Sequence, residues 1–169
     1  MGSNVRICGI EPESIVDGKG LRYVIFTQGC RHQCPGCHNP QSHPLDGGKS
    51  ADIYNLFEEI CENPLLTGVT FSGGEPFYQA EPLSKLARMV HIMGLDITTY
   101  TGYLYEELVA MRDFHINVLL EQTDTLIDGP FVLAEKDLTL VFRGSRNQRI
   151  IDMNETRRSG KLMLEKQVS

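Results

Sequence analysis

The sequence predicts an α/β fold built around a mainly parallel sheet. Short segments rich in β-branched and aromatic residues alternate with segments whose apolar residues recur at helical spacing. Repeated strand–helix units of this kind imply parallel strands joined by right-handed crossovers. In such folds the loops after the strands carry the functional site, and most of the distinctive motifs of this chain follow predicted strands.

The first predicted strand, Arg22–Phe26, lacks polar alternation, as expected for a strand covered on both faces. After a possible cap at Ser50, apolar residues at i, i+3, i+4, i+7 and i+8 predict a helix over residues 51–62 and turn the Cys61 thiol toward the core. The later elements follow in order. We expect a strand in the run Gly68–Phe71, a helix from Pro82 that Gly94 can close, a strand at Asp96–Tyr100, a short helix at Leu104–Met111, and strands at Thr125–Asp128 and Leu138–Phe142.

Composition narrows the class of protein. A net charge of −6 argues against a nucleic-acid-binding surface, and no apolar run approaches the ~20 residues that span a bilayer. The N-terminus lacks the pattern of a signal peptide, so we expect a cytoplasmic protein with no membrane partner. Five cysteines, three of them clustered, fit metal ligation in a reducing compartment better than a disulfide framework.

The clustered cysteines are the most informative feature of the chain. Cys30, Cys34 and Cys37 form a CxxxCxxC triplet after the first predicted strand. Structural zinc sites and complete iron–sulfur cages normally use four protein ligands, whereas three thiolates can hold a [4Fe–4S] cube and leave its fourth iron open. The alternative is a Cys3His zinc site that one of the nearby histidines would complete, namely His32, His38 or His43.

A second motif, Ser72-Gly73-Gly74-Glu75-Pro76, follows the second predicted strand. With the cysteine loop after one strand and a GGE loop after the next, the chain resembles the radical S-adenosylmethionine (SAM) superfamily. Within it, the chain is most similar to the activating proteins of anaerobic (class III) ribonucleotide reductases. The stretches that carry this resemblance run from residue 16 to about residue 150: Val16–Gly20, Gly29–Pro40, Tyr100–Tyr103, Asp128–Phe131 and Arg143–Gln148.

The resemblance implies an incomplete (βα) barrel of the radical SAM type. The 169 residues fall short of the about 250 of a full eight-unit barrel, so the scaffold must be trimmed. We expect one radical SAM domain over residues 1–169, with residues 1–15 as an N-terminal extension and residues 153–169 as a tail without an assigned role.

The resemblance also implies two cofactors. A [4Fe–4S] cluster would be held by Cys30, Cys34 and Cys37, and its open iron would be chelated by the amino and carboxylate groups of SAM. One electron then cleaves SAM to methionine and a 5′-deoxyadenosyl radical, which takes a hydrogen atom from a glycine of the partner. The cluster and SAM would carry this chemistry without a separate catalytic side chain.

The SAM contacts that the resemblance implies come from several loops. Gly73 and Gly74 would let the backbone approach the methionyl group, and Glu75 would pair with its ammonium group. Gly36 is a departure, because many relatives place an aromatic residue there to pack against adenine. The full expected set is Gly36, Cys37, His38, Asn39, Ser72, Gly73, Gly74, Glu75, Thr101 and Asp128.

The expected partners are the large subunit of an anaerobic ribonucleotide reductase and a reductant of the flavodoxin or ferredoxin type. A polar cluster of Arg143, Arg146 and Gln148 is a candidate for partner docking or for closing the mouth of the barrel. Two alternatives remain open at this stage. The chain could be another radical SAM enzyme, such as an activase of the pyruvate formate-lyase type or a small-molecule enzyme with a trimmed barrel, or it could be a zinc-stabilised binding module.

Overall fold

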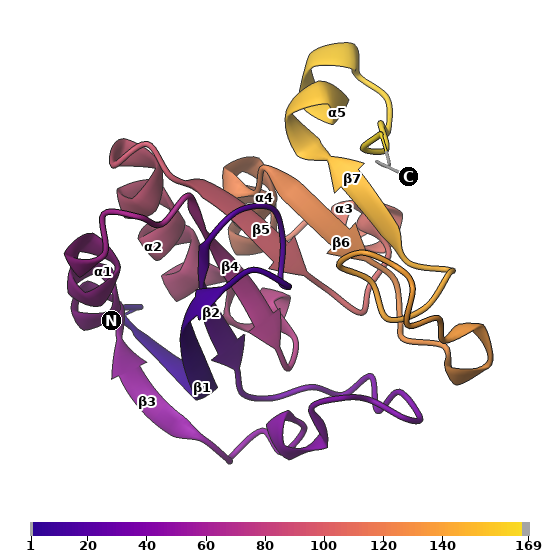
Figure 1. Cartoon of the computed structure of the whole chain (residues 1–169), viewed down its shortest axis with the longest axis horizontal. Coiled ribbons are helices and arrows are strands. Elements are labelled where there is room, and N and C mark those ends of the chain that lie inside the picture. Colours follow the sequence, from indigo (N-terminus) through magenta and orange to yellow (C-terminus); the bar gives the residue numbers. More distant parts are fainter. Residues whose placement is uncertain (1, 167–169) are drawn as a thin grey trace.

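The computed structural model describes residues 2–166, and its centre is a mixed seven-stranded sheet. The strands are β1 (Asn4–Ser14), β2 (Arg22–Thr27), β3 (Lys49–Asp52), β4 (Gly68–Gly73), β5 (Asp96–Tyr100), β6 (Thr125–Asp128) and β7 (Arg149–Asp152). Their order across the sheet is β3-β1-β2-β4-β5-β6-β7 (Figure 1). The four middle strands β2, β4, β5 and β6 are parallel, whereas β1, β3 and β7 pair antiparallel with their neighbours.

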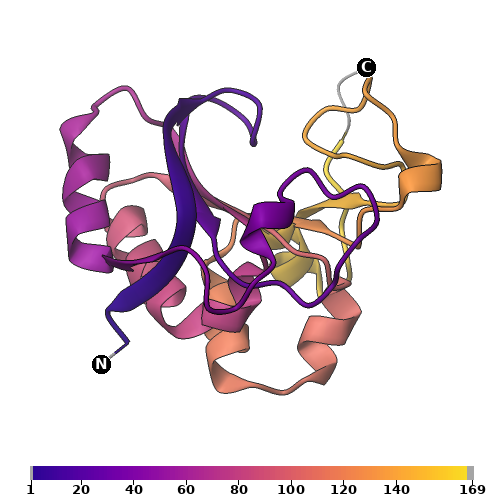
Figure 2. The ribbon, with the colours of Figure 1, turned by 90° about the horizontal axis from the view of Figure 1, so that it is seen from below.

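Three helices pack together against one face of the sheet. They are α1, α2 and α4, and they share one apolar core with alternate residues of the strands, such as Tyr23 and Ile25 of β2 (Figures 1 and 2). Successive strand residues point to opposite faces, so Phe26 faces the side away from these helices. The helices are α1 (Ile53–Glu62), α2 (Ala80–Ile92), α3 (Tyr105–Ala110), α4 (Phe114–Gln122) and α5 (Met153–Ser159).

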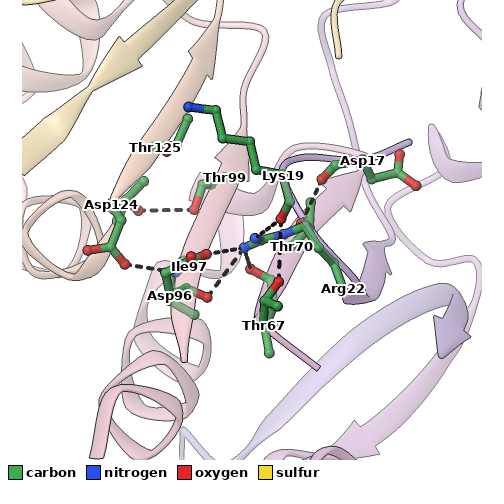
Figure 3. Close-up of polar contacts among 12 residues, drawn as sticks. Asp17, Lys19, Arg22, Thr67, Thr70, Asp96, Ile97, Thr99, Asp124 and Thr125 are labelled. Atoms are coloured by element: carbon green, nitrogen blue, oxygen red, sulfur yellow. Dashed lines mark hydrogen bonds and ion pairs between the residues drawn. The ribbon is translucent and has the colours of Figure 1, made fainter. Parts of the chain in front are cut away.

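The buried guanidinium of Arg22 connects the middle strands to the turn before β2 (Figure 3). The Arg22 side chain is 1% exposed, and its Nε donates to Thr70 Oγ1 at 2.7 Å. Its Nη2 lies 2.6 Å from Asp96 Oδ1, and its Nη1 donates to the carbonyl of Lys19 at 2.8 Å. Thr70 Oγ1 in turn donates to the carbonyl of Asp17. The network therefore fixes residues 17–19 against β4 and β5.

Most predicted elements are confirmed within two residues at either end, and the strands Asp96–Tyr100 and Thr125–Asp128 have the predicted bounds. The predicted strand Leu138–Phe142 is wrong, because these residues form an exposed turn in which the Asp137 carboxylate accepts the backbone N–H of Thr139. Leu138 is 85% exposed and Val141 is 56% exposed, so these two apolar side chains do not enter the core.

Two details of the predicted first helix are also wrong. Asp52, not Ser50, caps α1, because Asp52 Oδ1 accepts the backbone N–H of Tyr54 at 2.8 Å. The Cys61 thiol is exposed rather than part of the core, since α1 buries the residues Ile53, Leu56 and Ile60. A helix this short needs only a narrow apolar stripe, and Cys61 lies beside that stripe.

Both ends of the chain contribute to the sheet. Within the expected N-terminal extension, Asn4–Ser14 is the strand β1. Within the expected tail, α5 follows β7, and Leu164 forms an isolated bridge with Ile151; residues 167–169 of the tail lie outside the described residues. None of the helices in the described part of the chain is long and apolar enough to cross a membrane.

Replacing Arg22 tests whether this network holds the fold together. We expect Arg22→Met to lower the free energy of unfolding by about 2–4 kcal/mol, because buried acceptors on β4 lose their donor. Asp96→Asn is the matched control. The Asp96 side chain is 53% exposed and keeps an oxygen acceptor, so this change should cost less than about 1 kcal/mol. Urea denaturation followed by circular dichroism measures the free energy of unfolding of both variants. Equal losses in Arg22→Met and Asp96→Asn would contradict the conclusion that the Arg22 network holds the fold together.

Candidate functional site

A cavity of about 500 Å³ opens where the parallel strands end, a volume within the usual range for small-molecule sites. Residues that follow β2, β4, β5 and β6 form its walls, together with the segment before β7. The structure brings most of the predicted site residues together here: Cys30, Cys34, Cys37, His38, Asn39, Ser72, Gly73, Gly74 and Thr101. These predicted site residues therefore gather around one cavity at the carboxyl ends of the parallel strands.

The cysteine loop occupies one wall of this cavity. Cys30, Cys34 and Cys37 are free, partly buried thiols that all line it. Backbone N–H groups of Gly29 and Cys30 donate to the carbonyls of Ser42 and His43, which fixes the start of the loop against a later segment. Burial raises the pKa of the Cys30 thiol, so a metal that binds this sulfur must displace its proton.

The donor set of the cavity fits an iron–sulfur cluster better than one zinc ion. Within residues 2–166, no three His, Cys, Asp or Glu side chains converge closely enough to hold a single metal ion. A Cys3His zinc site needs all four ligands around one point. The thiolates of a [4Fe–4S] cube bind different irons, and this cavity offers three of them on one wall.

Gly73 and Gly74 line the cavity, but their lack of side chains has a packing reason. A Cβ at Gly73 would lie 2.5 Å from the backbone nitrogen of Thr27, and one at Gly74 would lie 2.5 Å from the carbonyl oxygen of Gly29. Gly73 also has a φ of +88°, in the region that favours glycine. The two glycines therefore let the end of β4 lie directly against the end of β2 and the cysteine loop.

Glu75 is not on the cavity wall, although the sequence placed it beside the ligand. Its side chain is fully buried and accepts hydrogen bonds from four protein donors. Its Oε1 lies 2.6 Å from Nε2 of His32, within the cysteine loop, and 2.9 Å from Thr101 Oγ1 and from Gly102 N after β5. Its Oε2 accepts the backbone N–H of Phe77 at 3.1 Å. Glu75 thus joins three loops from behind the cavity.

Asp128 and Gly36 also lie outside the residues that line the cavity. The Asp128 carboxylate is fully buried, where it pairs with Arg149 and accepts the backbone N–H of Tyr105 at 2.7 Å. A Cβ at Gly36 would lie 2.9 Å from Cδ1 of Leu133 and 3.3 Å from Cε1 of Phe131. The space beside Gly36 is therefore filled by side chains from the segment after β6.

Several residues on the cavity wall were not predicted as ligand contacts. The Phe131 ring contacts the cysteine loop, 5.4 Å from the His38 ring, and its other edge faces Gly144. Arg143 and Gln148 of the predicted polar cluster also line the cavity, whereas Arg146 is exposed. The other lining residues outside the expected set of SAM contacts are Val16, Asp17, Phe26, His32, His43, Tyr100, Gly102, Gly129, Leu140, Phe142 and Gly144. Most of these residues belong to the stretches that carry the family resemblance, and His32 and His43 were candidate zinc ligands.

Replacing Glu75 tests its role as the connection between the loops. We expect Glu75→Gln to destabilise the fold by about 2 kcal/mol and to lower the iron bound after anaerobic reconstitution, because an amide N–H₂ would face donors. Glu121→Gln, on the exposed face of α4, is the control and should change stability by less than about 0.5 kcal/mol. Urea unfolding and iron analysis measure both effects. Glu75→Gln protein with full stability and iron content would refute this role.

Comparison with known proteins agrees with this geometry. The family model described as a 4Fe-4S single cluster domain matches residues 16–151. The chain is 33% identical to the anaerobic ribonucleoside-triphosphate reductase-activating protein of Haemophilus influenzae, over 82% of this chain and 92% of that protein. It is 31% identical to the protein of that name from Escherichia coli K12, over 81% and 92%, and 32% identical to that of Enterobacteria phage T4, over 83% and 90%.

Among solved structures, QueE from Escherichia coli is a partial match, with a TM-score of 0.46 and 19% identity over 59% of this chain and 52% of that one. The sequence relatives are alike over nearly their whole length, and the cluster domain matched by the family model includes all three cysteines on the cavity wall. The chain belongs to the family of anaerobic ribonucleoside-triphosphate reductase-activating proteins.

Proposed function

We propose that this protein is a radical SAM enzyme that generates a glycyl radical on the large subunit of an anaerobic ribonucleotide reductase. The observation that carries the proposal is one cavity that gathers three cysteine thiols at the ends of parallel strands, in a chain of the reductase-activating family. The bound cofactors would supply the chemistry: with an electron from the cluster, SAM is cleaved to methionine and a 5′-deoxyadenosyl radical, which takes hydrogen from the glycine.

The cluster ligands in this proposal are Cys30, Cys34 and Cys37. Three thiolates leave one coordination position without a protein ligand, and SAM would take it through its amino and carboxylate groups. The three thiols are partly buried where they line the cavity. The role of the protein is to hold the ligands, orient SAM and limit access of water.

SAM would lie along the wall formed by the ends of β4 and β5. Ser72, Gly73 and Gly74 present backbone there, Thr101 lies beside them, and Cys37, His38 and Asn39 are on the cysteine side. Gly36, Glu75 and Asp128 would act from behind the walls. Glu75 holds the loops in register, Asp128 fixes Arg149 and the start of α3, and Gly36 leaves room for Phe131 and Leu133.

The architecture supports an incomplete (βα) barrel of the radical SAM type in one domain over residues 1–169. Four parallel strands connected through helices end at the cavity, and β1 and β7 extend the same sheet. The reductant would be a flavodoxin or ferredoxin. The net charge of −6 disfavours a nucleic-acid partner, and the free cysteines of the described chain suit a reducing compartment such as the cytoplasm.

The cluster assignment is tested by changing single cysteines. After anaerobic reconstitution, the unchanged protein should hold about four irons and four sulfides per chain and, once reduced, convert SAM to 5′-deoxyadenosine. Cys34→Ala should lose most of the cluster absorbance and cleave SAM at less than about 1% of the native rate, because the cluster loses one of its three thiolates.

Cys61→Ala is the matched control, since Cys61 is exposed on α1 and does not line the cavity. It should retain native iron, sulfide and SAM cleavage. Stoichiometric zinc in the purified protein, with no SAM cleavage after reconstitution, would contradict the proposed function.

A further inference from the structure

An apolar turn, residues 138–142, stands at the mouth of the functional cavity. Leu140 and Phe142 of this turn line the cavity, whereas Leu138 and Val141 are exposed and do not line it. Apolar residues scattered singly over a surface are common, but several of them gathered beside a site mark a contact surface. The turn therefore has one side in the cavity and presents apolar side chains to solvent on another.

The backbone of this turn is held by groups other than its exposed side chains. The N–H of Asp137 donates to the carbonyl of Gly144 at 3.2 Å, and the hydroxyl of Tyr100, on β5, donates to the carbonyl of Phe142 at 2.8 Å. Phe142 has a φ of +63°, a conformation that bulky residues rarely adopt and that clusters at functional sites. The turn is thus fixed in place without any contribution from its exposed apolar side chains.

A second pair of exposed apolar residues lies across the mouth from this turn. Ile15 and Val16, which follow β1, are 73% and 70% exposed. Val16 lines the functional cavity together with Leu140 and Phe142, and the two segments are neighbours in both views of the ribbon (Figures 1 and 2). Apolar side chains therefore flank the mouth on two sides.

The mouth continues along β1 into a second cavity of about 600 Å³. Four residues line both cavities: Val16, Asp17, Phe26 and Asn39. Among the described residues that line the second cavity, the charged ones are all acidic, namely Glu11, Glu13 and Asp17. A protein segment that passes from the functional cavity into the second one would meet negative charge, so basic side chains complement it.

We propose that the surface formed by Ile15, Leu138 and Val141 is where the large subunit of the anaerobic reductase docks, with apolar residues against these three and basic residues against Glu11 and Glu13. This rests on the proposed function, because a radical formed in the cavity reaches a glycine only if a segment of the partner enters through this mouth. A protein that enters must cover the residues that flank the mouth. Burial of their apolar surface stabilises the complex, and the charges orient it.

Binding measurements with the large subunit test this surface separately from the chemistry. Leu138→Asp, Val141→Asp and Ile15→Asp should each weaken the complex about tenfold or more, because each would place an unpaired carboxylate in the interface. None of the three residues lines the functional cavity, so iron content and SAM cleavage without the reductase should stay native. Anaerobic biolayer interferometry measures binding, and 5′-deoxyadenosine measures cleavage.

Glu11→Lys tests the charged part of the surface and should slow association with the large subunit, because it reverses a charge that attracts the partner. Leu65→Asp and Ile92→Asp are the matched controls. Leu65 is 72% exposed and Ile92 is 86% exposed, and neither lines either cavity. Both controls should bind the large subunit as the unchanged protein does.

Native affinity for the large subunit in Leu138→Asp, Val141→Asp and Ile15→Asp would overturn the proposal and leave the proposed function intact. Loss of self-association in sedimentation velocity without loss of reductase binding would also overturn it, since the surface would then join two copies of this chain. Unchanged association in Glu11→Lys would refute the charged part. A native protein that cleaves SAM but forms no radical on the reductase would instead defeat the proposed function itself.

Discussion

The buried carboxylate of Glu75 is the contact on which the site depends. A charge without solvent is tolerated only where several donors surround it, and Glu75 has four, from His32, Thr101, Gly102 and Phe77. These donors come from the cysteine loop, the loop after β5 and the turn after β4. Because one side chain must satisfy all of them at once, the loops cannot move independently. The cavity is thereby shaped before any cofactor enters it.

The two faces of the sheet have different roles, because one stabilises the fold and the other contributes to the candidate site. One face shares an apolar core with α1, α2 and α4, which supplies the main hydrophobic stabilisation. The other face carries polar and aromatic side chains, and the Arg22 network holds it to the turn before β2 (Figure 3). Asp17 in that turn lines the cavity, so the same guanidinium that stabilises the strands also positions part of the site.

Sequence patterns predicted the parts of the molecule that local rules control. The strands Asp96–Tyr100 and Thr125–Asp128 and the cysteine triplet at the end of a strand follow from short-range periodicity and spacing. Leu138–Phe142 has the composition of a strand but no neighbouring strand, and only the tertiary structure decides that. The motif around Glu75 gives its position in the chain and not the direction of its side chain, so its four protein donors could not be predicted from the sequence. Phe131 comes close to Gly36 across almost a hundred residues, which no local pattern could indicate.

The most direct test of glycyl-radical generation by this protein follows the hydrogen atom that is removed from the glycine Cα of the reductase. The large subunit of the anaerobic reductase would be prepared with glycine deuterated at Cα, then mixed anaerobically with the reconstituted protein, reductant and SAM. If this protein generates the glycyl radical, deuterium should appear in the 5′-methyl group of 5′-deoxyadenosine together with the electron paramagnetic resonance signal of the radical. Formation of 5′-deoxyadenosine that carries no deuterium, with no radical on the reductase, would contradict that claim.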